Sequence, residues 1–339
     1  MRERQVLALI IEGYIAFAEP IGSKTLSKAI MGRWSSATIR NTMAYLEDLG
    51  FLYKPHTVAG RIPTQKAFRY YLDGLNVPIH PGKKALQALD AMLKPRHSHV
   101  VEEIMEDASK ALAAISNYTG IVVEPRVNMM HFKEIEFVKL SKYTVLTLFV
   151  TSSGMVHTRL VDTDEDLKVE TLDGMKKYVN EKFGGAPFYA LKDGILEDIE
   201  ADKTKYYQLL KKINDTLETI IEAGDKREVY IEGVSKIIGV PELLDMERLK
   251  ELFQALEKKE KLIRLLDKCM KEEGIHVIMG NESDIKEMRD LSIITSTYRI
   301  GERSYGVLGV IGPIRMNYSR VIPIVDYTAK TVTDILKSL

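Results

Sequence analysis

Arg40 and Asn41 stand next to each other in a segment whose residue types can bind the edges of DNA bases. An arginine can donate two hydrogen bonds to guanine, and an asparagine can pair in a similar way with adenine. Ser36 and Tyr45 fall on the same outward helix face, and the methyl group of Thr38 can contact a thymine. An ordinary solvated helix face has a similar composition, so this face alone leaves both interpretations open. The inward face of the helix carries apolar residues at three- and four-residue steps: Ile39, Met43, Leu46 and Leu49.

A short basic hairpin follows this helix and favours the DNA-binding interpretation. Residues 51–63 can form two short strands, with Gly60 giving the backbone freedom to turn. Lys54, His56 and Arg61 on one such hairpin are unsuited to a protein core, but they suit DNA phosphates or the minor groove. We therefore expect His56 and Arg61 to position the protein on the DNA backbone.

Three short helices precede the hairpin. Apolar periodicity predicts the first over residues 6–17. The second covers residues 23–30, where Ser23, Lys24 and Thr25 lie at its start and the free amides of the first turn favour a phosphate. The third is the helix of the candidate base contacts, and a fourth follows the hairpin. Helix, helix, helix and hairpin is the order of a winged helix-turn-helix domain, which we expect over residues 1–75. Residues that can cap these helices are Ser23, Ser35, Ser36 and Thr64.

Charge and composition limit the classes of function. The chain of 339 residues has 48 basic and 48 acidic residues, so a histone-like protein that binds nucleic acid by bulk charge is excluded. Between Pro20 and Tyr70, eight lysines and arginines stand against two acidic residues, which confines a balance of +6 to the N-terminal part. Cys269 is the single cysteine, so the chain has no intrachain disulfide and no CxxC site. The apolar run at residues 6–11 is too short for a leader or a membrane span, and we expect a cytoplasmic protein with no membrane partner.

The remainder of the chain indicates an α+β multidomain protein. We expect a linker at residues 76–96, an α+β domain formed by residues 97–164 and 227–339, and a mostly helical insertion at residues 165–226. Two long apolar stripes exceed the needs of one small core, which predicts a dimer held together outside the N-terminal domain. These stripes run over residues 206–221 and 249–270. The predicted strands are at residues 131–138, 143–150, 155–161, 228–231, 276–279, 292–298 and 305–312.

Four stretches of this sequence resemble the heat-inducible transcription repressors, the HrcA family. The resemblance covers essentially the whole chain, and the long motifs are far more specific than a helix-turn-helix pattern alone. Val58 stands where the family commonly has serine, and Ala67 and Phe68 stand where it commonly has glycine and tyrosine. The difference at Val58 puts a single wing contact in doubt. The matching stretches are residues 19–26, residues 36–41 with Leu46 and Glu47, residues 55–69 and residues 310–320.

This resemblance implies a fold and a mode of action. Members of the family combine a winged helix with a GAF-like α+β domain, into which a dimerising domain is inserted. They bind inverted-repeat operators upstream of chaperonin genes as homodimers, and the chaperonin maintains their active fold. Heat occupies the chaperonin with unfolded clients, and the repressor loses its activity. For this chain the resemblance implies a repressor of chaperone operons whose partners are double-stranded DNA, a second copy of itself and chaperonin.

Two other functions are weighed against this one. A regulator in which the GAF-like domain senses a small molecule is the alternative that the sequence leaves open. An enzyme with an attached DNA-binding module is disfavoured, because no catalytic motif is present. We expect no cofactor and no metal. The glycines at positions 306, 309 and 312 do not have the spacing of a phosphate-binding loop and indicate close strand packing, and the acidic run at residues 162–166 indicates a solvated turn. His97 and His99 are two residues apart and have no nearby cysteine to complete a zinc site, so we expect them to be surface histidines.

Overall fold

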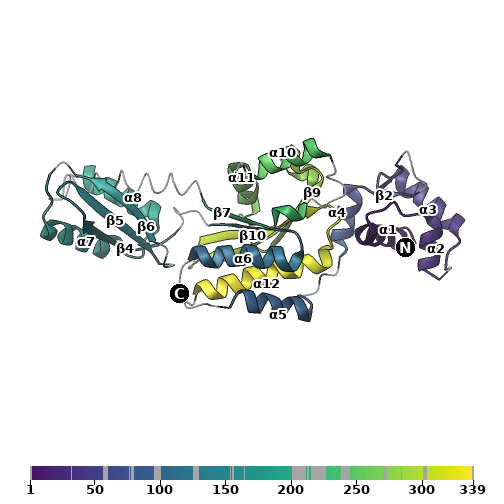
Figure 1. The fold of residues 1–339 in the computed structure, drawn as a ribbon, viewed down its shortest axis with the longest axis horizontal. Helices are drawn as coiled ribbons and strands as arrows, with labels where there is room; N and C mark the ends of the chain where they lie inside the picture. The colour runs from purple at the N-terminus through teal and green to yellow at the C-terminus, as the bar shows by residue number, and fades with distance from the viewer. Residues whose placement is uncertain are drawn as a thin grey trace.

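The computed structural model describes three bodies, which lie in a row in Figure 1. A small N-terminal domain forms one end, a domain with a five-stranded sheet lies in the middle, and a three-stranded sheet with two helices forms the other end. His56, His97, His99 and most of residues 206–221 lie outside the described residues. The description covers the chain except for residues 1, 32, 56–59, 76, 78–79, 95–100, 125–129, 153, 155, 164, 201–210, 212–213, 215–226, 238–244, 258, 270–272, 284, 301–303 and 338–339.

The N-terminal domain has the predicted order of helices and hairpin. Strands β1 and β2 pair in antiparallel fashion, with Leu52 opposite Pro63, and a bridge between Ile21 and Arg61 adds a third short strand segment. The helices pack around an apolar core that includes the fully buried Ile39. The elements are α1 (Arg2–Phe17), α2 (Ser23–Ala29), α3 (Ser36–Asp48), β1 (Leu52–Tyr53), β2 (Ile62–Pro63) and α4 (Gln65–Asp73).

Of the four candidate caps, Ser35 and Thr64 are confirmed, whereas Ser23 and Ser36 are the first residues of their helices. Ser35 accepts a hydrogen bond from the backbone amide of Thr38 at the start of α3, and Thr64 accepts one from the amide of Ala67 at the start of α4. Gly22 holds the cap position of α2 without a side-chain bond, so Ser23 lies inside the first turn. A serine there no longer faces the free amides as a cap does.

The central domain is built on an antiparallel sheet in the order β7-β3-β10-β9-β8. Helices α5, α6 and α12 lie on one side of the sheet, and α10 and α11 lie on the other (Figure 1). The strands are β3 (Thr119–Val123), β7 (Val229–Glu232), β8 (Ile275–Met279), β9 (Leu291–Ile300) and β10 (Ser304–Pro313). The helices are α5 (Lys83–Met92), α6 (Val101–Ser116), α10 (Met246–Glu257), α11 (Lys259–Cys269) and α12 (Tyr318–Lys337).

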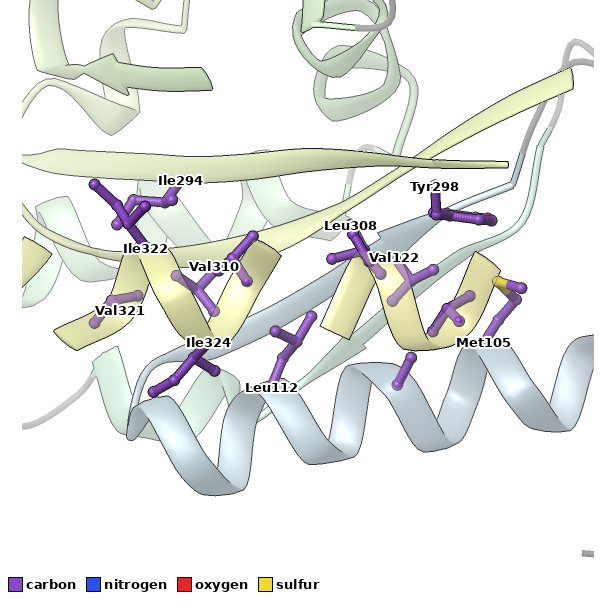
Figure 2. Close-up of a cluster of buried hydrophobic side chains, with 14 of the residues drawn as sticks. Met105, Leu112, Val122, Ile294, Tyr298, Leu308, Val310, Val321, Ile322 and Ile324 are labelled. Carbon is purple, nitrogen blue, oxygen red and sulfur yellow. The ribbon is translucent and has the colours of Figure 1, made fainter. Parts of the chain in front are cut away.

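The sheet separates two apolar layers because neighbouring residues of a strand point to opposite faces. Val122 belongs to the layer formed with α6 and α12, whereas Ile121 and Val123 belong to the layer formed with α10 and α11. Figure 2 shows the first layer, in which Met105 and Leu112 of α6 approach residues of the sheet and of α12. Burial on both faces explains the apolar runs of β3 and β8, whereas β9 also buries the hydroxyl residues Ser292, Thr295 and Ser296.

The stripe at residues 249–270 is used inside this chain, which corrects one expectation. Leu252 and Leu266 are fully buried, and both belong to the layer that packs on the sheet. The described part of the stripe is therefore core and does not form a dimer surface. The predicted linker at residues 76–96 also contains part of the central domain, because α5 packs against α6 and α12 and buries Leu89.

Strands β4, β5 and β6 form a sheet of their own and pair with no described strand of the central sheet. Helix α7 packs on this small sheet, where the Asn180 side chain bonds to the backbone amide and carbonyl of Ile135. The boundary expected at residue 165 therefore divides a packed unit, and this part of the chain is α+β instead of mostly helical. Periodicity found the strands but could not tell which sheet they join. The elements are β4 (Phe132–Lys139), β5 (Thr144–Thr151), β6 (Val156–Asp162), α7 (Val169–Phe183) and α8 (Phe188–Glu200).

Glycines in the central sheet stand where another chain segment approaches closely, as the spacing of the three C-terminal glycines predicted. A Cβ atom at Gly309 would lie 2.1 Å from the carbonyl oxygen of Ile294 on the neighbouring strand. A Cβ atom at Gly120 of β3 would lie 2.2 Å from the carbonyl oxygen of Ser109, because α6 crosses directly over this strand. The contact between helix and sheet therefore depends on the missing side chain.

We predict that Gly120→Ala lowers the free energy of unfolding by about 2 to 4 kcal/mol, because backbone must move to admit the methyl group. Urea unfolding followed by circular dichroism measures the change. Gly82→Ala is the control, since nothing lies within 4 Å of a Cβ atom at the start of α5, and it should change stability by less than about 1 kcal/mol. Equal effects of the two substitutions would contradict the close approach of α6.

Candidate nucleic-acid interface

Helix α3 has one face in the core and one face in solvent. Ile39, Met43 and Leu46 are buried, whereas Arg40 and Asn41 are exposed near the start of the helix. Tyr45 is also on the outward side and is 54% exposed. Leu49, predicted in the buried stripe, is exposed because α3 ends at Asp48. The side chains expected to contact bases are thus held on a rigid helix and are free to meet a groove.

Hydroxyl groups fix the junction between α2 and α3. The hydroxyl of Ser23 lies 3.0 Å from that of Ser36, which joins the first turns of the two helices. Thr38 is 2.9 Å from Ser35 between side-chain oxygens, next to the cap of α3. Ser23, Ser36 and Thr38 were expected to touch DNA, but here Ser23 and Ser36 lie within hydrogen-bond distance of each other and Thr38 of Ser35. The contact between Ser23 and Ser36 joins α2 to α3.

Trp34, between α2 and α3, is held by two further contacts. The guanidinium of Arg33 lies over the ring of Trp34, 5.3 Å from the centroid, and the Ser27 hydroxyl donates to the Trp34 carbonyl at 3.0 Å. Arg33 and Lys28 are exposed basic residues that the sequence analysis did not select. Lys28 follows Lys24 by one helical turn, and this spacing was the signal that would have found it.

Arg61 does not fit the expected role of a free phosphate contact. Its Nε atom donates to Glu47 Oε2 at 2.7 Å, and its Nη1 atom donates to the carbonyl of Gly60 at 3.4 Å. The Arg61 side chain is only 17% exposed. The ion pair joins the hairpin to α3, so Arg61 holds the wing in place. Fourteen residues separate Arg61 from Glu47, and no local pattern predicts such a pair.

Other exposed side chains that the sequence analysis selected, or that belong to the predicted hairpin, lie on the elements before and after α3. Lys24 and Thr25 are exposed at the start of α2, and Lys54 is exposed on the hairpin. Within the part of the chain that the structure describes, Lys24, Lys54 and Arg40 form no ion pair with a carboxylate. Free cations next to an exposed Arg and Asn are the arrangement that binds a polyanion and contacts its bases.

The described residues contain no group of three or more His, Cys, Asp or Glu side chains placed to hold a metal ion. No helix among them has both the length and the apolar character needed to cross a membrane.

Comparisons with known proteins relate the whole chain to one family. A family model described as the HrcA protein C terminal domain matches residues 102–322. A protein of Geobacter sulfurreducens named heat-inducible transcription repressor HrcA is 40% identical, over 99% of this chain and 98% of its own length. The protein of the same name from Syntrophobacter fumaroxidans is 36% identical, over 99% and 97%.

A solved structure agrees with the fold over the same extent. The crystal structure of a hypothetical protein at 2.2 Å resolution has a TM-score of 0.60 and 21% sequence identity, and it covers 99% of this chain and 98% of its own. That likeness concerns the fold, whereas the sequence matches concern the family. The resemblance expected from the sequence motifs is confirmed: this chain belongs to the HrcA family of heat-inducible transcription repressors.

Proposed function

We propose that this chain represses chaperone operons by binding an inverted-repeat operator as a homodimer through its winged helix. The observation that carries the proposal is the exposed position of Arg40 and Asn41 side by side on α3, opposite the buried Ile39. A helix presented in this way can enter the major groove with its N-terminal half next to the base edges. Lys24 and Lys54 lie on the flanking elements, where a helix-turn-helix protein contacts phosphates.

The homodimer is supported by an uncovered face of the small sheet. Helix α7 packs on one face of β4, β5 and β6, and residues of the other face remain exposed, with Leu160 at 64%. Val138, Leu146 and Leu160 stand opposite one another across the three strands, which makes a continuous apolar row. Each chain has one winged helix, and an inverted repeat has two half-sites related by twofold symmetry. A second copy of this chain is therefore the partner that we assign to this face.

The loss of activity on heating and the role of chaperonin are proposed from the family resemblance. One physical observation supports the chaperonin as partner. A chain that has not paired leaves the apolar face around Leu160 and Val156 open, and contiguous apolar surface of this kind attracts other proteins. A monomer released from its dimer is then the form that a chaperonin would bind.

The alternative, a small-molecule sensor in a GAF-like central domain, receives less support. A cleft lies between α10 and residues 286–290, but charged side chains line it. Several of these charges are paired, with Arg248 3.5 Å from Asp290 and Lys261 3.1 Å from Glu287. Effector pockets are mostly apolar with a few polar groups, so this cleft is a poor candidate.

We predict that Arg40→Ala or Asn41→Ala weakens operator binding by about 1 to 3 kcal/mol and random-DNA binding much less, because a base contact counts only where the base is present. The operator is first located by footprinting on the chaperonin promoter of the source organism. Salt titrations on the footprinted duplex and on a scrambled duplex then give both affinities, with circular dichroism to confirm folding. An unchanged specificity ratio in folded variants would show that α3 does not contact the bases.

Two variants serve as contrasts in these titrations. Lys24→Ala should weaken binding to both duplexes alike. It should also reduce the slope of log affinity against log salt by roughly one counterion, as expected for a phosphate contact. Arg61→Ala removes the ion pair with Glu47, so it should lower the stability of the domain with a smaller change of the salt slope. If Arg61→Ala reduced the salt slope by a full counterion, Arg61 would be a phosphate contact after all.

We predict that Leu160→Arg shifts the chain from dimer to monomer, because an unpaired charge would be buried in the contact between two copies. Sedimentation over a range of protein concentrations measures the equilibrium. Met246→Arg is the matched control, since Met246 is also an exposed apolar residue but lies on α10 of the central domain. A dimer that persists in Leu160→Arg would place the contact between copies elsewhere.

We predict that chaperonin with ATP raises the fraction of operator-binding protein recovered after denaturation. Gel-shift titration of the refolded chain measures this fraction, and an inert protein at equal concentration controls for crowding. Equal recovery with and without chaperonin, together with release of DNA by an added metabolite, would instead support the small-molecule sensor.

A further inference from the structure

Helix α4 belongs to the winged helix but also touches the central domain, at the corner after β8. Arg69 Nε donates to Glu282 Oε1 at 2.9 Å, and Arg69 Nη2 bonds both to Glu282 Oε2 and, at 2.9 Å, to the carbonyl of Val277. Gln65 Nε2 donates to the carbonyl of Met279 at 3.1 Å, and Gln65 Oε1 accepts from the amide of Asn281 at 3.2 Å. Two side chains one helical turn apart thus make five hydrogen bonds across a sequence separation of more than 200 residues.

The corner that receives them is rigid. Glu282 Oε2 also accepts from the backbone amide of Met279 at 2.9 Å, so the carboxylate that holds Arg69 is itself tied to the turn. Gly280 has a φ of +31°, and a Cβ atom there would lie 2.2 Å from the carbonyl oxygen of Arg289 and 2.8 Å from Gln65 Oε1. The side chain of Gln65 therefore rests directly on a glycine. A guanidinium that makes two parallel hydrogen bonds to one carboxylate is fixed in direction as well as in distance.

The same helix is part of the core of the winged helix. Ala67 and Phe68, between Gln65 and Arg69, are buried in that core. A rotation of α4 relative to the central domain would therefore carry the whole winged helix with it, including α3. Beyond α4 the chain continues through residues 74–82 before α5 begins.

We propose that Gln65 and Arg69 are positioning residues that clamp the winged helix onto the corner at residues 277–282, so that the two α3 helices of a dimer reach both half-sites of an operator together. The inference rests on the proposed dimeric binding of an inverted repeat. The clamp leaves the contacts with one half-site unchanged. It raises the effective concentration of the second winged helix at the second half-site, which is a matter of geometry and not of new contacts with DNA.

A merely stabilising contact would behave differently. If Arg69 and Glu282 only stabilised the fold, their loss would reduce binding to a single half-site and to the full operator in the same proportion. The loss of a clamp weakens binding to the full operator but not to a single half-site. It also makes binding less sensitive to the distance between half-sites. The two roles are therefore separated by the choice of DNA.

The experiment uses the full chain with Arg69→Gln and, separately, Glu282→Gln. Three kinds of duplex are compared: the footprinted inverted repeat, a single half-site, and inverted repeats whose spacer is lengthened by one or two base pairs. We expect each substitution to weaken binding to the inverted repeat about tenfold and binding to the half-site less than about twofold. The penalty for the lengthened spacers should decrease. Arg69→Lys keeps the charge but loses the bidentate pair with Glu282. Its affinity for the inverted repeat should therefore lie between that of the wild type and that of Arg69→Gln.

Arg299→Gln and Glu273→Gln are the matched controls, because Arg299 and Glu273 form an exposed arginine–glutamate pair within the central domain. These substitutions should leave the affinity for all three kinds of duplex unchanged. Equal losses on half-site and inverted repeat, or unchanged discrimination between spacers, would overturn the clamp while leaving the proposed function intact. A wild-type chain that binds the inverted repeat no more tightly than the half-site would overturn the proposed dimeric binding and the clamp with it.

Discussion

The pairing of β3 with β10 is the constraint on which the central domain depends. Val123 of β3 stands opposite Val307, and the register continues along five residue pairs. β3 precedes the small sheet in the sequence and β10 follows it, so the two halves of the domain meet here. The hydrogen bond from the Tyr298 hydroxyl on β9 to the Val123 carbonyl depends on this register, because β10 lies between β9 and β3. The apolar layers on either side of the sheet, and the corner at residues 277–282, follow from it.

Three arginines of the winged helix show how position decides the use of one residue type. Arg40 is exposed on α3 and free of ion pairs within the described residues, which suits it to bases. Arg61 is bound to Glu47 and keeps the hairpin against α3. Arg69 is held by Glu282 of another domain. All three can donate several hydrogen bonds, but only the first keeps its donors for a partner outside the chain.

The winged helix was predictable because its signals are local. Helix periodicity and the caps at Ser35 and Thr64 act within a few residues, and the exposed side of α3 followed from the buried one. The glycine at position 60 was predicted for its backbone freedom, but its φ is not positive, and it is needed because a Cβ atom there would lie 2.6 Å from the backbone of Pro20. The pairs of Arg61 with Glu47 and of Arg69 with Glu282 were missed, although both arginines lie in a motif that the sequence analysis selected, because no periodicity encodes a tertiary pair. The division of the later strands into two sheets was missed for the same reason. A strand pattern states which residues are buried and leaves the neighbouring strand undefined.

The strands of the central sheet come from distant parts of the sequence, and this determines the order in which the domains can fold. During synthesis the winged helix is complete by residue 75, long before β9 and β10 leave the ribosome, and domains fold as units from the N-terminus. The Tyr298–Val123 bond closes a separation of 175 residues, and contacts of such high order form slowly. A nascent chain therefore carries a folded N-terminal domain before the corner at residues 277–282, which contacts α4, has been made. Under the proposed function, operator binding by the full chain would have to wait for this last pairing, so a cell that folds proteins slowly would also delay the activity of newly made chains.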